Sequence, residues 1–193
     1  GAELVGRRGR GGRVAHRLAL DHSRAVERIA VFDIAPTATM YARTDKDFAT
    51  RYFWWFFLIQ PFDLPERMIG ADPEFFLRKH IDGQIKVKGA TEPEAFAEYL
   101  RCYMDPATRH AICEDYRAAA TIDLVHDRES RARGESVRCP LLCLWGTKGK
   151  IGQWYDALAI WRSDTALTVT LSATTAGSLE ESGYFQWAMF MTE

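Results

Sequence analysis

The sequence predicts an α/β fold in which a mostly parallel sheet is interrupted by an inserted all-helical segment. Two short apolar runs, 28–34 and 139–145, are bounded by turn residues and have the length of buried parallel strands. Stretches with helical spacing flank these runs, so strands and helices alternate. Over 39–133 the alternation stops, and the sequence becomes helical in pattern, aromatic-rich and punctuated by prolines. We therefore expect a sheet part at 1–38, a helical cap at 39–133 and a second sheet part at 134–193.

The chain opens on a short apolar end that passes through a glycine–arginine turn into a helical pattern. In the helix expected over 13–22, apolar residues recur four apart, as at Val14 and Leu18, and so share one face. A sharp strand-to-helix turn presents the backbone N–H groups of a helix N-terminus to a ligand. The turn over 6–12 has glycines for such a bend but no Ser, Cys or Asp at its apex. Its spacing fits neither a phosphate-binding loop nor a long arginine–glycine RNA-binding tract.

The second expected strand, 28–34, ends at a breaker that contains Pro36. Asp33 then lies at the C-terminal end of a parallel strand, which is where ligands of open α/β sheets bind.

Prolines beside acidic residues mark the helix starts of the inserted segment, at Pro73, Pro93 and Pro106. The clearest helices are expected over 94–104 and 106–120.

The sheet pattern returns after the cap. A strand over 139–145 is stopped by Gly146, a helix is expected over 154–162, and 166–171 alternates as a further strand. The segment 180–185 is expected to form a turn.

Composition excludes several functional classes. The 193 residues carry a net charge of −1, which gives no general attraction to nucleic acid or to anionic membranes. No apolar run reaches the roughly 18 residues of a membrane span. The four cysteines form no C-x-x-C pair, and the five histidines show no metal spacing. We expect reduced thiols, a cytoplasmic location, and neither a metal nor an organic cofactor.

Five segments resemble the haloacetate (fluoroacetate) dehalogenases of the α/β-hydrolase superfamily, in matching order and at similar spacing. They are 10–22, 32–37, 60–66, 69–73 and 113–118. The resemblance implies a partial α/β-hydrolase fold, the C-terminal half of a mostly parallel sheet with an inserted helical cap, truncated at its N-terminus.

The resemblance also implies a chemistry that this chain carries only in part. In the family, an Asp on the strand-to-helix elbow displaces halide from a 2-haloacid. A His then activates the water that hydrolyses the ester, and a second Asp orients that His. The orienting acid corresponds to Asp33, but the nucleophile position is occupied by Gly9 and the base position by Tyr184. The resemblance therefore implies impaired turnover.

The substrate-binding positions of the family match this chain better than its catalytic positions do. Its two carboxylate-binding arginines correspond to Arg10 and Arg13, whose guanidinium groups can donate paired hydrogen bonds. Its halide-binding Trp and Tyr correspond to Trp55 and Tyr116. Trp54 stands where the family has a His, and Gln84 stands where it has a second Trp.

Two alternatives to an impaired haloacid dehalogenase stay open. The chain could be a non-catalytic binder of small carboxylates or a non-functional fragment, or it could be another α/β hydrolase such as an epoxide hydrolase or an esterase. The expected partner is a small-molecule carboxylate, with a homodimer as a possible assembly.

Overall fold

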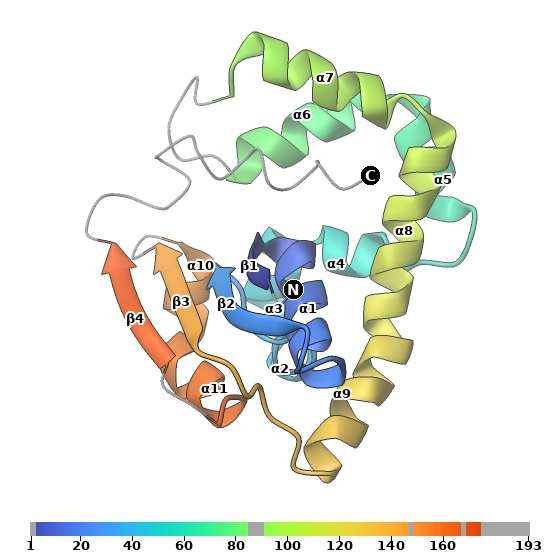
Figure 1. The fold of residues 1–193 in the computed structure, drawn as a ribbon. Coiled ribbons are helices and arrows are strands. Elements are labelled where there is room, and N and C mark those ends of the chain that lie inside the picture. The colour runs from blue at the N-terminus through green and yellow to red at the C-terminus, as the bar shows by residue number, and fades with distance from the viewer. Residues whose placement is uncertain (1–2, 85–90, 147–148, 167–168, 175–193) are drawn as a thin grey trace. The chain divides into compact units, whose positions relative to one another are not determined.

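The computed structural model describes residues 3–84, 91–146, 149–166 and 169–174 (Figure 1). The chain separates into two compact units. The first, which we call the sheet unit, comprises Gly1–Thr39 and Asp127–Glu193. The second, the helical unit, comprises Met40–His126.

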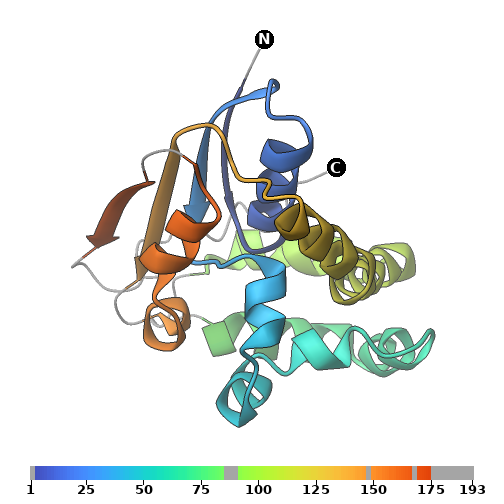
Figure 2. The same cartoon turned by 90° about the horizontal axis from the view of Figure 1, so that it is seen from below.

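The sheet unit holds a parallel sheet whose strands lie side by side in chain order, β1-β2-β3-β4 (Figure 2). The strands are β1 (Glu3–Arg8), β2 (Val26–Phe32), β3 (Leu141–Gly146) and β4 (Val169–Thr174). The predicted parallel sheet is thus confirmed. β2 ends before the expected residue 34 because Asp33 has a φ of 53° and leaves the extended region of the backbone.

Helix α1 (Gly9–Asp21) connects β1 to β2 and packs on both strands. Small buried residues on its inner face, Ala15 and Ala19, let the helix approach the sheet closely. The helix begins four residues before the expected Arg13, because its glycines have low helix propensity and hide the first turn in the sequence.

A buried aromatic contact joins α1 to helix α11 (Ala157–Ser163). The rings of His16 and Trp161 lie edge to face with centroids 5.3 Å apart, and the Trp161 indole donates a 2.9 Å hydrogen bond to the Ile34 carbonyl. Burial lowers the pKa of His16, so its ring packs in the neutral form. The single helix expected over 154–162 is instead two helices, α10 (Lys150–Trp154) and α11.

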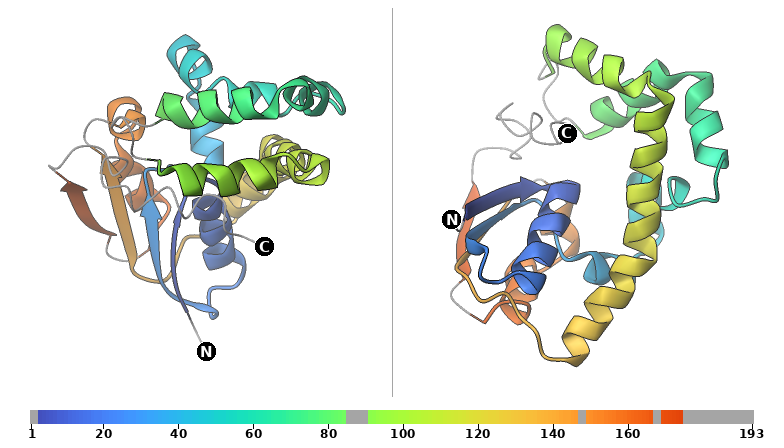
Figure 3. Two further views of the ribbon diagram at one scale, coloured as in Figure 1. Left: turned by 90° about the horizontal axis from the view of Figure 1, so that it is seen from above. Right: turned by 45° about the vertical axis from the view of Figure 1, so that its right-hand side comes forward.

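The helical unit contains α3 (Lys46–Arg51), α4 (Trp54–Phe57), α5 (Leu64–Ala71), α6 (Pro73–Gln84), α7 (Pro93–Tyr103) and α8 (Pro106–Ala120). Helix α2 (Thr37–Ala42) leads into this unit, and α9 (Ile122–Ala132) leads out of it. Figure 3 shows α6 beside α7 and α5 beside α8, in agreement with their packing contacts.

The predicted helix starts at the three prolines are confirmed. At α8, the Asp105 carboxylate caps the helix by accepting a 2.9 Å hydrogen bond from the Ala107 N–H. At α6, Asp72 accepts a 3.0 Å bond from the Phe75 N–H in the same way.

Candidate active site

The strand-to-helix turn of the sheet unit is an abrupt elbow. β1 ends at Arg8, and α1 begins at the next residue, Gly9, whose φ is +56°. This left-handed conformation costs glycine little but strains other residues. Among the described residues, no atom lies within 4 Å of a Cβ built on Gly9. The elbow therefore has room for a side chain at this position and carries none.

Asp33 lies next to this elbow at the same edge of the sheet. Arg8 pairs with Phe32 in the parallel register, so Gly9 and Asp33 are the first residues beyond paired positions on neighbouring strands. Neighbouring strands lie about 4.8 Å apart, which brings the two residues close together. The Asp33 N–H donates a 2.8 Å hydrogen bond to the Leu144 carbonyl and so fixes the acid against β3.

Two glycines that follow β3 in the chain, Gly146 and Gly149, lie against the Asp33 carboxylate. The Gly146 N–H donates a long, 3.4 Å hydrogen bond to Asp33 Oδ1, and the Gly149 N–H donates to the Gly146 carbonyl at 3.0 Å. A Cβ built on Gly149 would lie 3.1 Å from Asp33 Oδ1 and 3.2 Å from the Gly146 oxygen. A Cβ at this position would therefore require the Asp33 carboxylate or the Gly146 carbonyl to shift by a few tenths of an ångström. Gly149 is not among the predicted site residues, although a glycine just after a strand is a signal for close backbone approach.

The nearby thiol of Cys143 is not a nucleophile. It is buried on β3, and burial, with the negative charge of Asp33 adding to it, raises the pKa of Cys143 to about 12. The thiol therefore stays protonated at neutral pH.

Arg10 and Arg13 lie in the first turns of α1, three residues apart and both half-buried. Residues at this spacing project from the same side of a helix. Their predicted role as a carboxylate clamp stays a prediction.

In the helical unit the structure brings Trp55 and Tyr116 together. Their ring centroids are 6.1 Å apart with the rings edge to face, and Trp55 also contacts Tyr41 and Phe48 at 5.1 and 5.6 Å. Trp55 is only 6% exposed. The two halide-binding positions implied by the family resemblance are therefore neighbours.

Trp54 has neighbours of its own in the same aromatic cluster, to which it is joined through the Tyr52–Phe48 contact at 5.4 Å. Its ring lies 4.8 Å from Tyr52 and 4.5 Å from His80. Gln84 Nε2 lies 2.7 Å from His80 Nε2. This contact links the two ends of the last turn of α6. His80 is not among the predicted site residues, because no local pattern in the sequence links it to Trp54.

The predicted site residues thus fall into two sets. Gly9, Asp33 and the arginines are in the sheet unit, whereas Trp54, Trp55 and Tyr116 are in the helical unit. Tyr184, the residue at the base position, lies outside the described residues.

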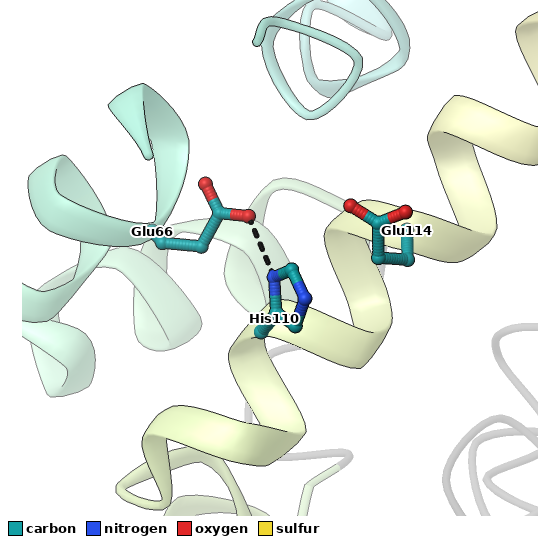
Figure 4. A group of neighbouring side chains, drawn as sticks. All are labelled: Glu66, His110 and Glu114. Carbon is teal, nitrogen blue, oxygen red and sulfur yellow. Dashed lines mark hydrogen bonds and ion pairs between the residues drawn. The ribbon is translucent and has the colours of Figure 1, made fainter. Parts of the chain in front are cut away.

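Within the described part of the chain, one cluster has the side chains of a metal site. Glu66 on α5 lies beside His110 and Glu114 on α8, with their ligand atoms within 4.8 Å of one another (Figure 4). Arg117 already binds both carboxylates, at 2.7 Å to Glu66 and 2.6 Å to Glu114. This guanidinium supplies the positive charge that a metal ion would bring, so we interpret the cluster as an ion network that ties α5 to α8.

The pKa of Glu66 reflects this network. Burial alone would raise it, but hydrogen bonds from Arg117 and His110 outweigh burial and lower the pKa of Glu66 to about 2.

None of the helices in the described residues is long and apolar enough to span a bilayer.

Comparisons with known proteins identify the fold. No family model matches the chain. A curated fluoroacetate dehalogenase from a Burkholderia species is 40% identical over 157 residues, which is 79% of this chain and 50% of that protein. A crystal structure of a proposed α/β hydrolase from Nostoc sp. PCC 7120 is 48% identical and superposes with a TM-score of 0.87, covering 100% of this chain and 67% of that one. The chain belongs to the α/β hydrolases.

The resemblance to haloacetate dehalogenases is therefore confirmed at the level of family and fold. A solved protein from Salmonella enterica, described as a proposed acyltransferase, shares this hydrolase fold with 57% identity and a TM-score of 0.87, over 94% of this chain and 60% of that one. The α/β-hydrolase chain spans about half the length of its curated dehalogenase relative.

As in other α/β hydrolases, the strand-to-helix elbow stands at the C-terminal edge of a parallel sheet. This α/β hydrolase has a glycine on the elbow and an acid on the neighbouring strand end.

Proposed function

We propose that this α/β hydrolase descends from haloacid dehalogenases and still binds their class of substrate. We further propose that it does not turn the substrate over, because the nucleophile is missing at the elbow. The proposal rests on one observation above all. Gly9 has a φ of +56° at the junction of β1 and α1, and Asp33 stands beside it at the next strand end. This is the backbone of a nucleophile elbow without the attacking side chain.

The proposed block follows from the chemistry. In dehalogenation through an aspartyl ester, a carboxylate attacks the α-carbon, a carbon–oxygen bond forms and the halide leaves with the bonding electrons. Glycine has no group that can attack. At the base position a phenol, with an ordinary pKa of about 10, is a poor proton acceptor at pH 7.

The binding part of the proposal rests on residues that remain. Arg10 and Arg13 lie on one side of the first turns of α1, where two guanidinium groups suit a small carboxylate. Trp55 and Tyr116, whose rings touch, carry an indole N–H and a phenolic O–H that suit a halide. The proposed ligand class is therefore small 2-halo or 2-hydroxy carboxylates.

Two measurements on the purified chain test the proposal. We expect no fluoride release from fluoroacetate with an ion-selective electrode, and heat of binding with chloroacetate or glycolate at millimolar concentration by calorimetry. Fluoride release that Asp33→Asn abolishes would overturn the proposed block. An absence of binding heat would instead reject the carboxylate site and leave the non-functional alternative.

A further inference from the structure

The elbow position without a side chain has room for a small molecule. Gly9 is half-buried, and no described atom lies within 4 Å of a Cβ built on it. Carbon atoms in van der Waals contact are about 3.5 to 4 Å apart, so this space admits a small group that is not bonded to the chain. The part of an aspartate that Gly9 lacks is a carboxylate, and a free carboxylate is small enough to take its place.

The formal charges of the elbow admit a second anion beside a bound haloacid. Arg10 and Arg13 lie in the first turns of α1, and the register of β1 and β2 brings Asp33 close to Gly9. Two guanidinium groups balance the sum of one carboxylate on the chain and one on the haloacid. A second anion is then neither strongly attracted nor strongly repelled, and we expect it to bind only at millimolar concentrations or above.

We propose that a free small carboxylate, formate above all, enters this space and supplies the nucleophile that Gly9 lacks. The inference rests on the proposed function, because the haloacid must be bound at the arginines. A formate oxygen attacks the α-carbon of chloroacetate, a carbon–oxygen bond forms, and the chloride leaves with the electron pair of the carbon–chlorine bond. The products are chloride and the ester formyloxyacetate, and no proton is gained or lost.

A free nucleophile also removes the need for the base at position 184. When the nucleophile belongs to the chain, the ester stays attached to it, and a base must activate water to release the product. When the nucleophile is a free carboxylate, the ester is itself the product and leaves. Transfer to a free carboxylate is therefore compatible with both Gly9 and Tyr184, whereas hydrolysis requires both of the groups that these residues replace.

The size of the space predicts an order among carboxylates. Formate is a carboxylate with one hydrogen, whereas acetate carries a methyl group that must stay in van der Waals contact with the Gly9 backbone. This methyl group pushes the attacking oxygens outward by about one bond length, roughly 1.5 Å. Because a misplacement of about 1 Å can cost about 100-fold in rate, formate should react at least tenfold faster than acetate.

Chloride release from chloroacetate tests the inference, with the purified chain in a buffer free of chloride and of other carboxylates. We expect release above the rate in buffer alone only when formate is added, and mass spectrometry should detect one formyloxyacetate for each chloride. Gly9→Ala should lower this release at least tenfold, because its methyl group takes the space. Gly134→Ala is the matched control and should leave release unchanged. Gly134 also has a left-handed φ, +67°, and no described atom within 4 Å of a built Cβ, but it lies after α9.

Calorimetry with chloroacetate separates this inference from the proposed function. Binding heat without formate-dependent release, or release that a folded Gly9→Ala leaves unchanged, would overturn the free nucleophile and leave the proposed function intact. Release at the same rate without formate would overturn both the free nucleophile and the proposed block, and an absence of both heat and release would reject both proposals. Circular dichroism shows whether each variant is folded. If Gly9→Ala is not, the preference of the unmodified chain decides, and acetate reacting as fast as formate would overturn the inference.

Discussion

Neutralising Glu66 should destabilise the helical unit by an amount that depends on pH. The two carboxylate oxygens of Glu66 accept hydrogen bonds from the Arg117 guanidinium at 2.7 and 3.0 Å, and the Glu66 side chain is only 11% exposed. Its pKa falls from an ordinary 4.5 to about 2 in the folded chain. This difference of about 2.5 pH units, at about 1.36 kcal/mol each, corresponds to about 3 kcal/mol. Because a glutamine keeps one hydrogen bond to Arg117, Glu66→Gln should cost about 2 to 3 kcal/mol at pH 7.

The sign of the pH dependence follows from the lowered pKa. A carboxylate with a lowered folded-state pKa stabilises the fold above its unfolded pKa of 4.5, and this stabilisation is lost as the pH falls towards 2. At pH 3, about 1.4 kcal/mol of the contribution remains by the same relation. The destabilisation caused by Glu66→Gln should therefore shrink by more than half between pH 7 and pH 3.

Urea unfolding, followed by circular dichroism and tryptophan fluorescence, measures the loss of stability caused by Glu66→Gln at pH 7 and at pH 3. The matched control is Glu74→Gln, which removes an ion pair with Arg78 between side chains that are 53% and 51% exposed. Such a surface pair contributes less than about 1 kcal/mol. A loss of stability at Glu66 that is the same at pH 7 and pH 3, or no larger than that at Glu74, would refute the network as a source of stability.

Three further predictions concern the sheet unit and its elbow. Gly9→Asp alone should lower the free energy of unfolding in urea by about 1 to 2 kcal/mol, because φ at this position is +56°. The double variant Gly9→Asp/Tyr184→His should release halide from a haloacid. A folded double variant that releases none would contradict the assignment of Gly9 to the nucleophile position. Arg13→Gln should weaken chloroacetate binding at least tenfold by calorimetry, and unchanged affinity would place the carboxylate elsewhere. Gly149→Ala should destabilise the chain by about 1 to 3 kcal/mol because its Cβ meets atoms at 3.1 and 3.2 Å. Gly83→Ala, where a Cβ meets no described atom within 4 Å, is the matched control and should be neutral or stabilising.

The parts of the fold that local chemistry specifies were predicted from the sequence. The helices that start at Pro93 and Pro106 were correct to within about one residue, because proline at the first turn is a local signal. The first turn of α1 was missed, because its glycines oppose helix formation locally and are held helical by the packing of α1 on the sheet.

The candidate site was predictable only where sequence order decides position. Asp33 could be placed at a strand end from the run that precedes it. The approach of Gly149 to Asp33, and the contact of His80 with Trp54, join residues that are distant in sequence through tertiary packing. No pattern of spacing encodes such contacts.

Two residues of the elbow region have a left-handed backbone, and they show why the fold tolerates glycine at position 9. Gly9 and Asp33 both have a φ above 50°, and both follow directly from strands whose chain must turn at the sheet edge. Asp33 has a side chain, so its left-handed backbone is strained. Glycine at position 9 avoids this strain, which amounts to about 1 to 2 kcal/mol of conformational free energy. Replacing a side chain at the elbow by glycine therefore gives a small gain in stability, and selection for activity is what keeps the side chain there. Once turnover is not required, glycine is the residue that the elbow backbone favours.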